Sequence, residues 1–323
     1  MNRYHLTHVT EFLYEGPVSE SYNEVRLRPM HDERQSCLSF TLTTSPRSIA
    51  VPYRDAYGNW AHQFNVLQEH SHLRIVGEST ILVHDSPSAV FESMSLADFD
   101  SSGKQLCDEY LDFVAPTTYV PHLSVVNQLV DVVGHLSGGT VLGFAQSASD
   151  LIHQRFRYVK GATQVQSSIE DALSLGAGVC QDFAHLLLGV VRMRGIPGRY
   201  VSGYLVPQSR NGHGASLEEV IGGQASHAWT EVYIPGGGWL GLDPTLGAPV
   251  GLRHVRVAYG RDYGDVPPVR GLYKGAAGQR LSVDVRVRPV LNDDGCEQLQ
   301  ETVAKNPSQP SADRAQQPAQ QQQ

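Results

Sequence analysis

Cysteine is scarce in this sequence, and its spacing suggests no cross-linked scaffold. Cys37, Cys107, Cys180 and Cys296 are the only four among 323 residues. Their separations fit neither a disulfide framework nor a zinc motif. Unpaired cysteines are typical of a reducing compartment, so we expect a cytoplasmic protein.

Long apolar runs and an excess of positive charge are also missing. No stretch approaches the roughly 20 apolar residues of a membrane span, and no basic start leads into an apolar run. We therefore expect no membrane partner and no secretory signal. The net charge of −8 argues against a nucleic-acid partner and against a polybasic patch.

The first 85 residues have the pattern of an antiparallel β domain. Strand-like segments are separated by turns, and Gly16-Pro17 is expected to end the first of them. His70 and His72 would share one face of a strand, but no nearby carboxylate or thiol completes a ligand set, so we predict no metal site. The expected strands are 3–13, 21–27, 37–43, 49–53, 60–67 and 73–83.

Helical spacing replaces the strand pattern after residue 86. Segments 106–114, 125–136 and 141–156 carry it, and proline or glycine separates them. Further on, 254–258 and 281–287 are expected strands. The polar loop 207–224 is long enough to form a lid. From residue 305 the chain is rich in proline, serine, alanine and glutamine, and we expect disorder there.

Cys180 lies where a nucleophile would be more useful than a core residue. A small-residue stretch, 176–179, precedes it, and apolar residues at helical spacing follow over 183–191. Gly195-Ile196-Pro197 ends that pattern. Cys180 is thus expected in the first turn of a buried helix, where unpaired N–H groups and the helix dipole favour negative charge.

A predicted hairpin supplies a base and an acid. Residues 226–234 and 239–245 are strand-like, and Pro235-Gly236-Gly237-Gly238 joins them. His227 begins one arm and Asp243 ends the other, so their side chains should be neighbours. A thiol, an imidazole and a carboxylate that orients the imidazole are the parts of a Cys-His-Asp triad.

Two nearby polar residues have simpler explanations. His185 follows Cys180 by five positions, which turns it about 140° away around a helix. We therefore interpret His185 as a structural histidine rather than the base. Asp182 is expected to stabilise the helix N-terminus as an acid in the first turn.

These motifs together resemble the transglutaminase-like superfamily, and in particular its bacterial members. The order and spacing of Cys180, His227 and Asp243 match that family, and so does the opening segment 4–14. The resemblance implies an α+β fold, with a bacterial transglutaminase-like N-terminal region at 1–85 and a papain-like catalytic core at 86–290. From its composition, the remaining tail at 291–323 is expected to be disordered. The remaining matching segments are 178–186 (GVCQDFAHL), 195–204 (GIPGRYVSGY), 226–229 (SHAW), 243–245 (DPT) and 260–271 (GRDYGDVPPVRG).

The resemblance also implies a cysteine-dependent enzyme acting on a peptide or protein amide through a thioester acyl-enzyme. We expect a peptidase, an amidase or a small-peptide acyltransferase that needs no cofactor. Two alternatives remain open: a protein-crosslinking transglutaminase and a non-catalytic binding scaffold. No Asp/Asn/Gly-rich calcium loop of the kind found in calcium-dependent crosslinkers is visible. The presence of all three triad residues argues against a scaffold.

Overall fold

A computed structural model describes residues 1–84, 94–207, 226–275, 278–290 and 319–320. The chain divides into two compact units. The expected lid loop lies almost entirely outside the described residues, as does most of the expected disordered tail. The first unit comprises Met1–Asp85, Leu205–Ala225 and Pro267–Gln321, and the second comprises Ser86–Tyr204, Ser226–Val266 and Gln322–Gln323.

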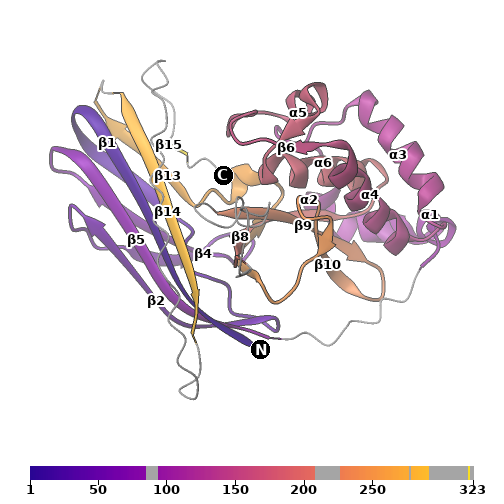
Figure 1. Ribbon diagram of the computed structural model, residues 1–323, viewed down its shortest axis with the longest axis horizontal. Helices are drawn as coiled ribbons and strands as arrows, with labels where there is room; N and C mark the ends of the chain where they lie inside the picture. The colour runs from indigo at the N-terminus through magenta and orange to yellow at the C-terminus, as the bar shows by residue number, and fades with distance from the viewer. Residues whose placement is uncertain (85–93, 208–225, 276–277, 291–318, 321–323) are drawn as a thin grey trace, which may run out of the picture. The chain divides into compact units, whose positions relative to one another are not determined.

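The first unit is an antiparallel sheet organised around one long strand, β1 (Asn2–Val25) (Figure 1). Alternate residues from Tyr4 to Tyr14 are buried, as the two-residue period of a strand requires. A hydrophobic cluster that includes Phe12, Phe64 and Ile75 forms the core. The other strands are β2 (Gln35–Ser45), β3 (Val51–Arg54), β4 (Trp60–Val66), β5 (His70–Val83), β13 (Val269–Lys274), β14 (Gln279–Pro289) and β15 (Ala319–Gln320).

Three features of this sheet differ from the sequence-based expectation. Gly16-Pro17 does not end the first strand; the pairing of β1 with β5 instead changes register between Leu13 and Val18. Strands β13 and β14, expected within the 86–290 core, pair with β1 in the first unit. In the expected tail, β15 pairs with β13. Antiparallel pairing with β1 holds these strands in the first unit, and no local pattern in residues 267–289 indicates this partner.

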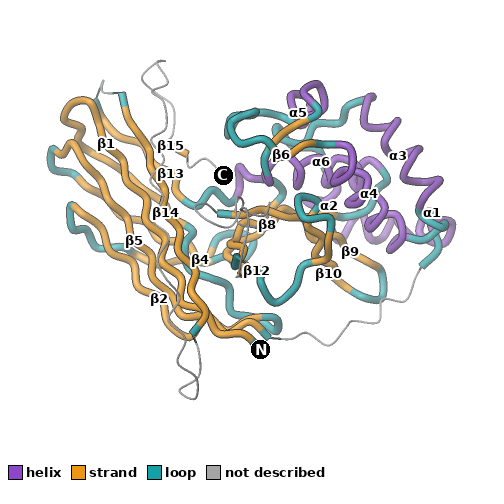
Figure 2. The backbone as a smooth tube through the Cα atoms, in the orientation of Figure 1, coloured by secondary structure: helices purple, strands orange, loops and turns teal. Residues whose placement is uncertain are grey.

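The second unit combines helices with a five-stranded sheet (Figure 2). The helices and the sheet of this unit, together with the antiparallel sheet of the first unit, confirm the predicted α+β fold class. No helix within the described ranges is long and apolar enough to cross a bilayer. The helices are α1 (Leu96–Glu109), α2 (Leu111–Val114), α3 (Ser124–Leu136), α4 (Val141–Arg155), α5 (Ile169–Leu175), α6 (Cys180–Met193) and the 3-10 turn η1 (Tyr263–Asp265). The sheet order is β11 (Ala248–Pro249), β10 (Gly238–Asp243), β9 (His227–Ile234), β8 (Gly198–Leu205) and β12 (His254–Gly260), and β6 (Arg157–Tyr158) pairs separately with β7 (Ala177–Gly178).

Helix α6 is the buried centre of this unit. Every residue from Cys180 to Arg192 is buried, and the helix packs against α3, α4 and β9. The Thr230 hydroxyl on β9 donates a hydrogen bond of 3.0 Å to the Ala184 carbonyl on α6. This contact ties the cysteine helix to the strand that carries His227.

Candidate active site

Cys180 is the first residue of α6 and is 2% exposed. Asp182 caps this helix end: its carboxylate accepts hydrogen bonds from the Val179 backbone N–H at 2.7 Å and from the Thr163 hydroxyl. Burial raises the pKa of Asp182 above its usual range, although both hydrogen bonds act to lower it. The prediction of Asp182 as a structural acid of the first turn agrees with these contacts.

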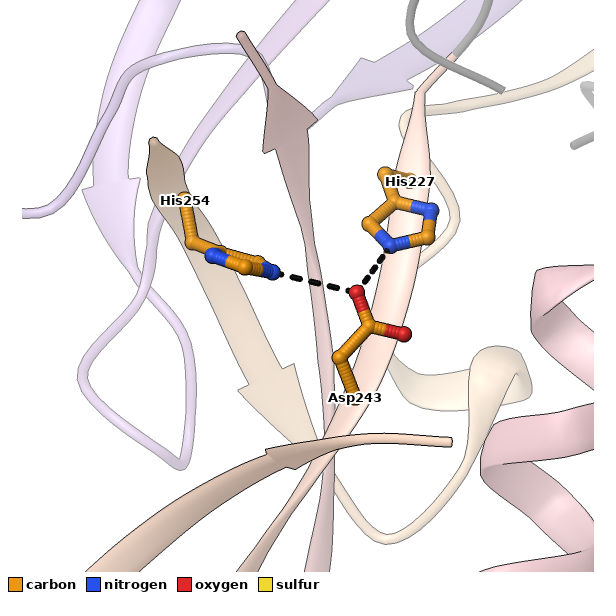
Figure 3. A group of neighbouring side chains, drawn as sticks. All are labelled: His227, Asp243 and His254. Carbon is orange, nitrogen blue, oxygen red and sulfur yellow. Dashed lines mark hydrogen bonds and ion pairs between the residues drawn. The ribbon is translucent and has the colours of Figure 1, made fainter. Parts of the chain in front are cut away.

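The hairpin of β9 and β10 brings His227 and Asp243 together (Figure 3). His227 is the first residue of β9 and Asp243 the last of β10, at the same end of the ladder. Nε2 of His227 donates a hydrogen bond of 2.7 Å to Oδ2 of Asp243. Both side chains are 0% exposed, so no water competes for this contact.

Both oxygens of the Asp243 carboxylate are hydrogen-bonded. Oδ1 accepts from the backbone N–H groups of Thr245 at 3.0 Å and Leu246 at 3.2 Å. Oδ2 accepts from His227 and, at 3.0 Å, from Nε2 of His254. Burial alone would raise the pKa of Asp243, but the charge of His227 and the hydrogen bonds from His227 and His254 hold it far below its usual range. Asp243 is therefore a fixed negative charge.

His227 connects this carboxylate to the cysteine. Burial would lower the pKa of His227, but the charge of Asp243, the hydrogen bond with it and the interaction with Cys180 together raise it. Within the described residues, Nδ1 makes no hydrogen bond of good geometry. Since Nε2 is taken by Asp243, Nδ1 is the ring nitrogen left to exchange a proton with Cys180.

His185 lies in a different environment, although it is only five residues from Cys180. Its Nε2 accepts the backbone N–H of Tyr263 at 3.2 Å, and its ring packs against Tyr119 and Tyr200. Burial, with the nearby Arg192 charge, lowers the pKa of His185 to about 3. The ring is thus neutral and held by structure, which agrees with its interpretation as a structural histidine.

The Trp229 ring packs against His227 and His254, and the space for this ring requires glycine at position 203. Trp229 is fully buried, and its ring meets that of His254 edge-on, with centroids 5.2 Å apart. A Cβ at Gly203 on β8 would lie 2.2 Å from the Val255 carbonyl oxygen and 2.5 Å from Cη2 of Trp229. Only glycine fits there without moving the wall of the site.

We expect Gly203→Ala to lower the free energy of unfolding by about 1–3 kcal/mol, because one of the two clashes is with backbone. Turnover should fall with it as Trp229 shifts. Chemical denaturation measures the stability. Gly134→Ala on α3, where a Cβ would have nothing within 4 Å, is the matched control. It should be neutral or stabilising, and equal destabilisation by both variants would contradict this role of Gly203.

Sequence reasoning did not identify His254. It begins β12, is 6% exposed and reaches the same carboxylate oxygen as His227. Its only signal in the sequence is a histidine at the start of an expected strand, 11 positions after Asp243. The ligand atoms of His227, Asp243 and His254 lie within 4.8 Å of one another, so they also have the spacing of a possible metal site.

Comparisons with known proteins identify relatives of this chain. Residues 4–82 match the bacterial transglutaminase-like N-terminal region, and residues 135–244 match the transglutaminase-like superfamily. An uncharacterized Mycobacterium leprae protein is 34% identical over 293 residues, covering 89% of this chain and 99% of its own. One from Mycobacterium tuberculosis is 32% identical over 320 residues, covering 90% and 94%. The structure of a candidate cysteine protease from Cytophaga hutchinsonii shares the fold, with a TM-score of 0.67 and 20% identity over 93% of this chain and 94% of that one.

Proposed function

The chain belongs to the transglutaminase-like superfamily, and from this we propose that it cleaves amide bonds with a triad of Cys180, His227 and Asp243. The observation that carries the proposal is the 2.7 Å hydrogen bond between His227 and Asp243, fully buried and coupled to Cys180. A buried acid that holds an imidazole against a cysteine at a helix N-terminus suits nucleophilic catalysis.

The first half of the reaction forms a thioester. The Cys180 thiol gives its proton to Nδ1 of His227, and the thiolate attacks the carbonyl carbon of the amide. Backbone N–H at the start of α6 stabilises the oxyanion. The C–N bond then breaks, and His227 returns the proton to the departing amine. Asp243 keeps the imidazole in the required tautomer and stabilises its positive charge.

The second half releases the acyl group. Neutral His227 removes a proton from water, and the water oxygen attacks the thioester carbonyl. The C–S bond breaks, and His227 returns its proton to the Cys180 thiolate, which leaves a carboxylic acid as product. A primary amine in place of water gives a new amide instead. We propose hydrolysis or transfer to a small acceptor, on a peptide or protein amide, as the principal activity.

Product analysis with peptide amides tests this assignment. Wild-type protein should release equal amounts of acid and amine from a cleaved peptide. Added primary amine should divert part of the acid into a new amide without changing the rate of amine release when acylation is rate-limiting. Product formed only in the presence of a protein-bound lysine acceptor would instead favour the crosslinking alternative.

Alkylation separates an enzyme from a binding scaffold. At pH 7 an ordinary thiol is only a few per cent ionised, whereas the interaction with His227 should make Cys180 at least about tenfold more reactive. Burial raises the pKa of Cys37, which makes it the internal control. Iodoacetamide labelling, followed by peptide mapping, measures both rates. Equal rates would support the scaffold.

We propose that the reaction takes place in the cytoplasm. Cys37 and Cys180 are free thiols, and a thiol nucleophile works best where disulfides do not form. Fractionation of cells that express the full chain checks this compartment. Recovery of the protein outside the cytoplasmic fraction would contradict it.

A further inference from the structure

His254 lies beside the proposed triad without being part of it. Its Nε2 is 3.0 Å from Oδ2 of Asp243, the oxygen that also receives the hydrogen bond from His227 (Figure 3). The two imidazoles approach this oxygen from β12 and β9. A buried histidine on the acid of a triad needs an explanation beyond packing, because hydrophobic residues would pack equally well.

The hydrogen bonds around His254 determine its protonation. The backbone N–H of Gly251 donates to Nδ1 at 3.2 Å, so Nδ1 carries no proton and Nε2 carries the hydrogen that Asp243 accepts. Burial lowers the pKa of His254, and so do the charges of His227 and Arg253. Asp243 acts to raise this pKa, but the net shift is downward. His254 is therefore a neutral donor that contributes a dipole and no charge.

We propose that His254 is a positioning residue that shares the Asp243 carboxylate with His227, fixes its direction and moderates its pull on the imidazole. This inference rests on the proposed function. Its first effect is geometric, since two donors on Oδ2 and two on Oδ1 leave the carboxylate no freedom to rotate. Outer partners of this kind commonly orient a working imidazole.

The second effect of His254 is electrostatic. The chemistry needs His227 in two states: protonated beside the thiolate, and neutral as the base that activates water. An unshared carboxylate at this buried position would hold the His227 proton too strongly for the second state. The N–H dipole of His254 offsets part of that attraction, because it points its positive end at the same oxygen.

A metal ion is the competing explanation for this cluster. The ligand atoms are close enough, but each Nε2 already donates a hydrogen to Asp243, and a metal would require both to turn or lose it. The two explanations separate on addition of a chelator. Hydrogen-bond positioning requires the same turnover with and without EDTA.

The test compares His254→Phe, which keeps a ring beside Trp229 but removes the donor, with His254→Gln, whose amide N–H can reach the position of Nε2. The rate of Cys180 alkylation is measured against pH, followed by kcat and KM on a cleaved amide. In His254→Phe the alkylation profile should move about 0.5–1 unit toward lower pH, because unshared Asp243 stabilises the imidazolium. The kcat of His254→Phe should fall about tenfold or more, and its KM should not change. The acid limb of its kcat–pH profile should move to higher pH, because His227 must be neutral to activate water.

His254→Gln should return both profiles toward wild type, and His62→Gln, in the first unit, should leave them unchanged. An alkylation profile of His254→Phe that coincides with wild type overturns the proposal even if turnover falls, since packing then explains the loss. A shift that glutamine does not reverse, or a loss of turnover in EDTA, also overturns it. If His254→Phe does not fold, His254→Asn replaces it, because the shorter amide cannot reach Oδ2. Alkylation needs no substrate, so absence of amide turnover in the wild type would refute the proposed function while leaving this test intact.

Discussion

Cys180→Ala should abolish amide turnover, with kcat reduced by roughly 10⁴-fold or more, because no other group can form the thioester. The fold should survive, since only one sulfur atom is removed from a side chain that is 2% exposed. We expect a change in the free energy of unfolding below about 2 kcal/mol. Steady-state kinetics and chemical denaturation of the same preparation measure both quantities.

Cys37→Ala is the matched control for this substitution. Cys37 is a free, half-buried thiol on β2 in the first unit, so its removal should leave turnover unchanged. A Cys180→Ala protein that is folded and retains more than residual turnover would exclude Cys180 from the mechanism.

His227→Ala should be nearly as damaging as the loss of Cys180. The thiol and the imidazole act as one unit, so removing either removes most of the same stabilisation of the transition state. Asp243→Asn should retain more activity, because the amide can still accept from Nε2 of His227 but carries no charge. It should lower the pH at which the imidazolium loses its proton, since the charge that raises the pKa of His227 is gone.

His185→Gln is the control that distinguishes the two histidines of the region. His185 is neutral and accepts a backbone N–H, so its replacement should reduce thermal stability more than kcat. Kinetics of the purified, folded variants decide the matter. If His185→Gln lost most of its turnover while His227→Ala lost little, our assignment of His227 as the base would be wrong.

The cysteine helix and the base–acid hairpin can be predicted because their signals are local. Small residues before Cys180, apolar spacing after it and a glycine-rich turn between two strands each act over a few residues. The structure has α6 and the β9–β10 hairpin at those positions. The hairpin alone is enough to bring His227 within reach of Asp243.

The missed features depend on contacts between distant segments. Tyr4 of β1 pairs with Pro289 of β14, and no sequence pattern near either residue indicates this pairing. Gly16-Pro17 resembles a strand end, yet the ladder continues past it with a shift of register because the neighbouring strands hold both halves. His254 reaches Asp243 only because β12 joins the same sheet as β10. Local patterns therefore predicted the cysteine helix and the hairpin, but they did not predict that His254 lies beside Asp243.

The most direct test of the triad is capture of the acyl-enzyme on Cys180. The full-length protein is mixed with a peptide-amide library at saturating concentration, quenched in acid and digested, and the Cys180 peptide is analysed by mass spectrometry. We predict an acyl adduct on Cys180 that hydroxylamine removes, as expected for a thioester, and that is missing from His227→Ala. Turnover of the library with no adduct on Cys180, or with an adduct on another residue, would contradict the account.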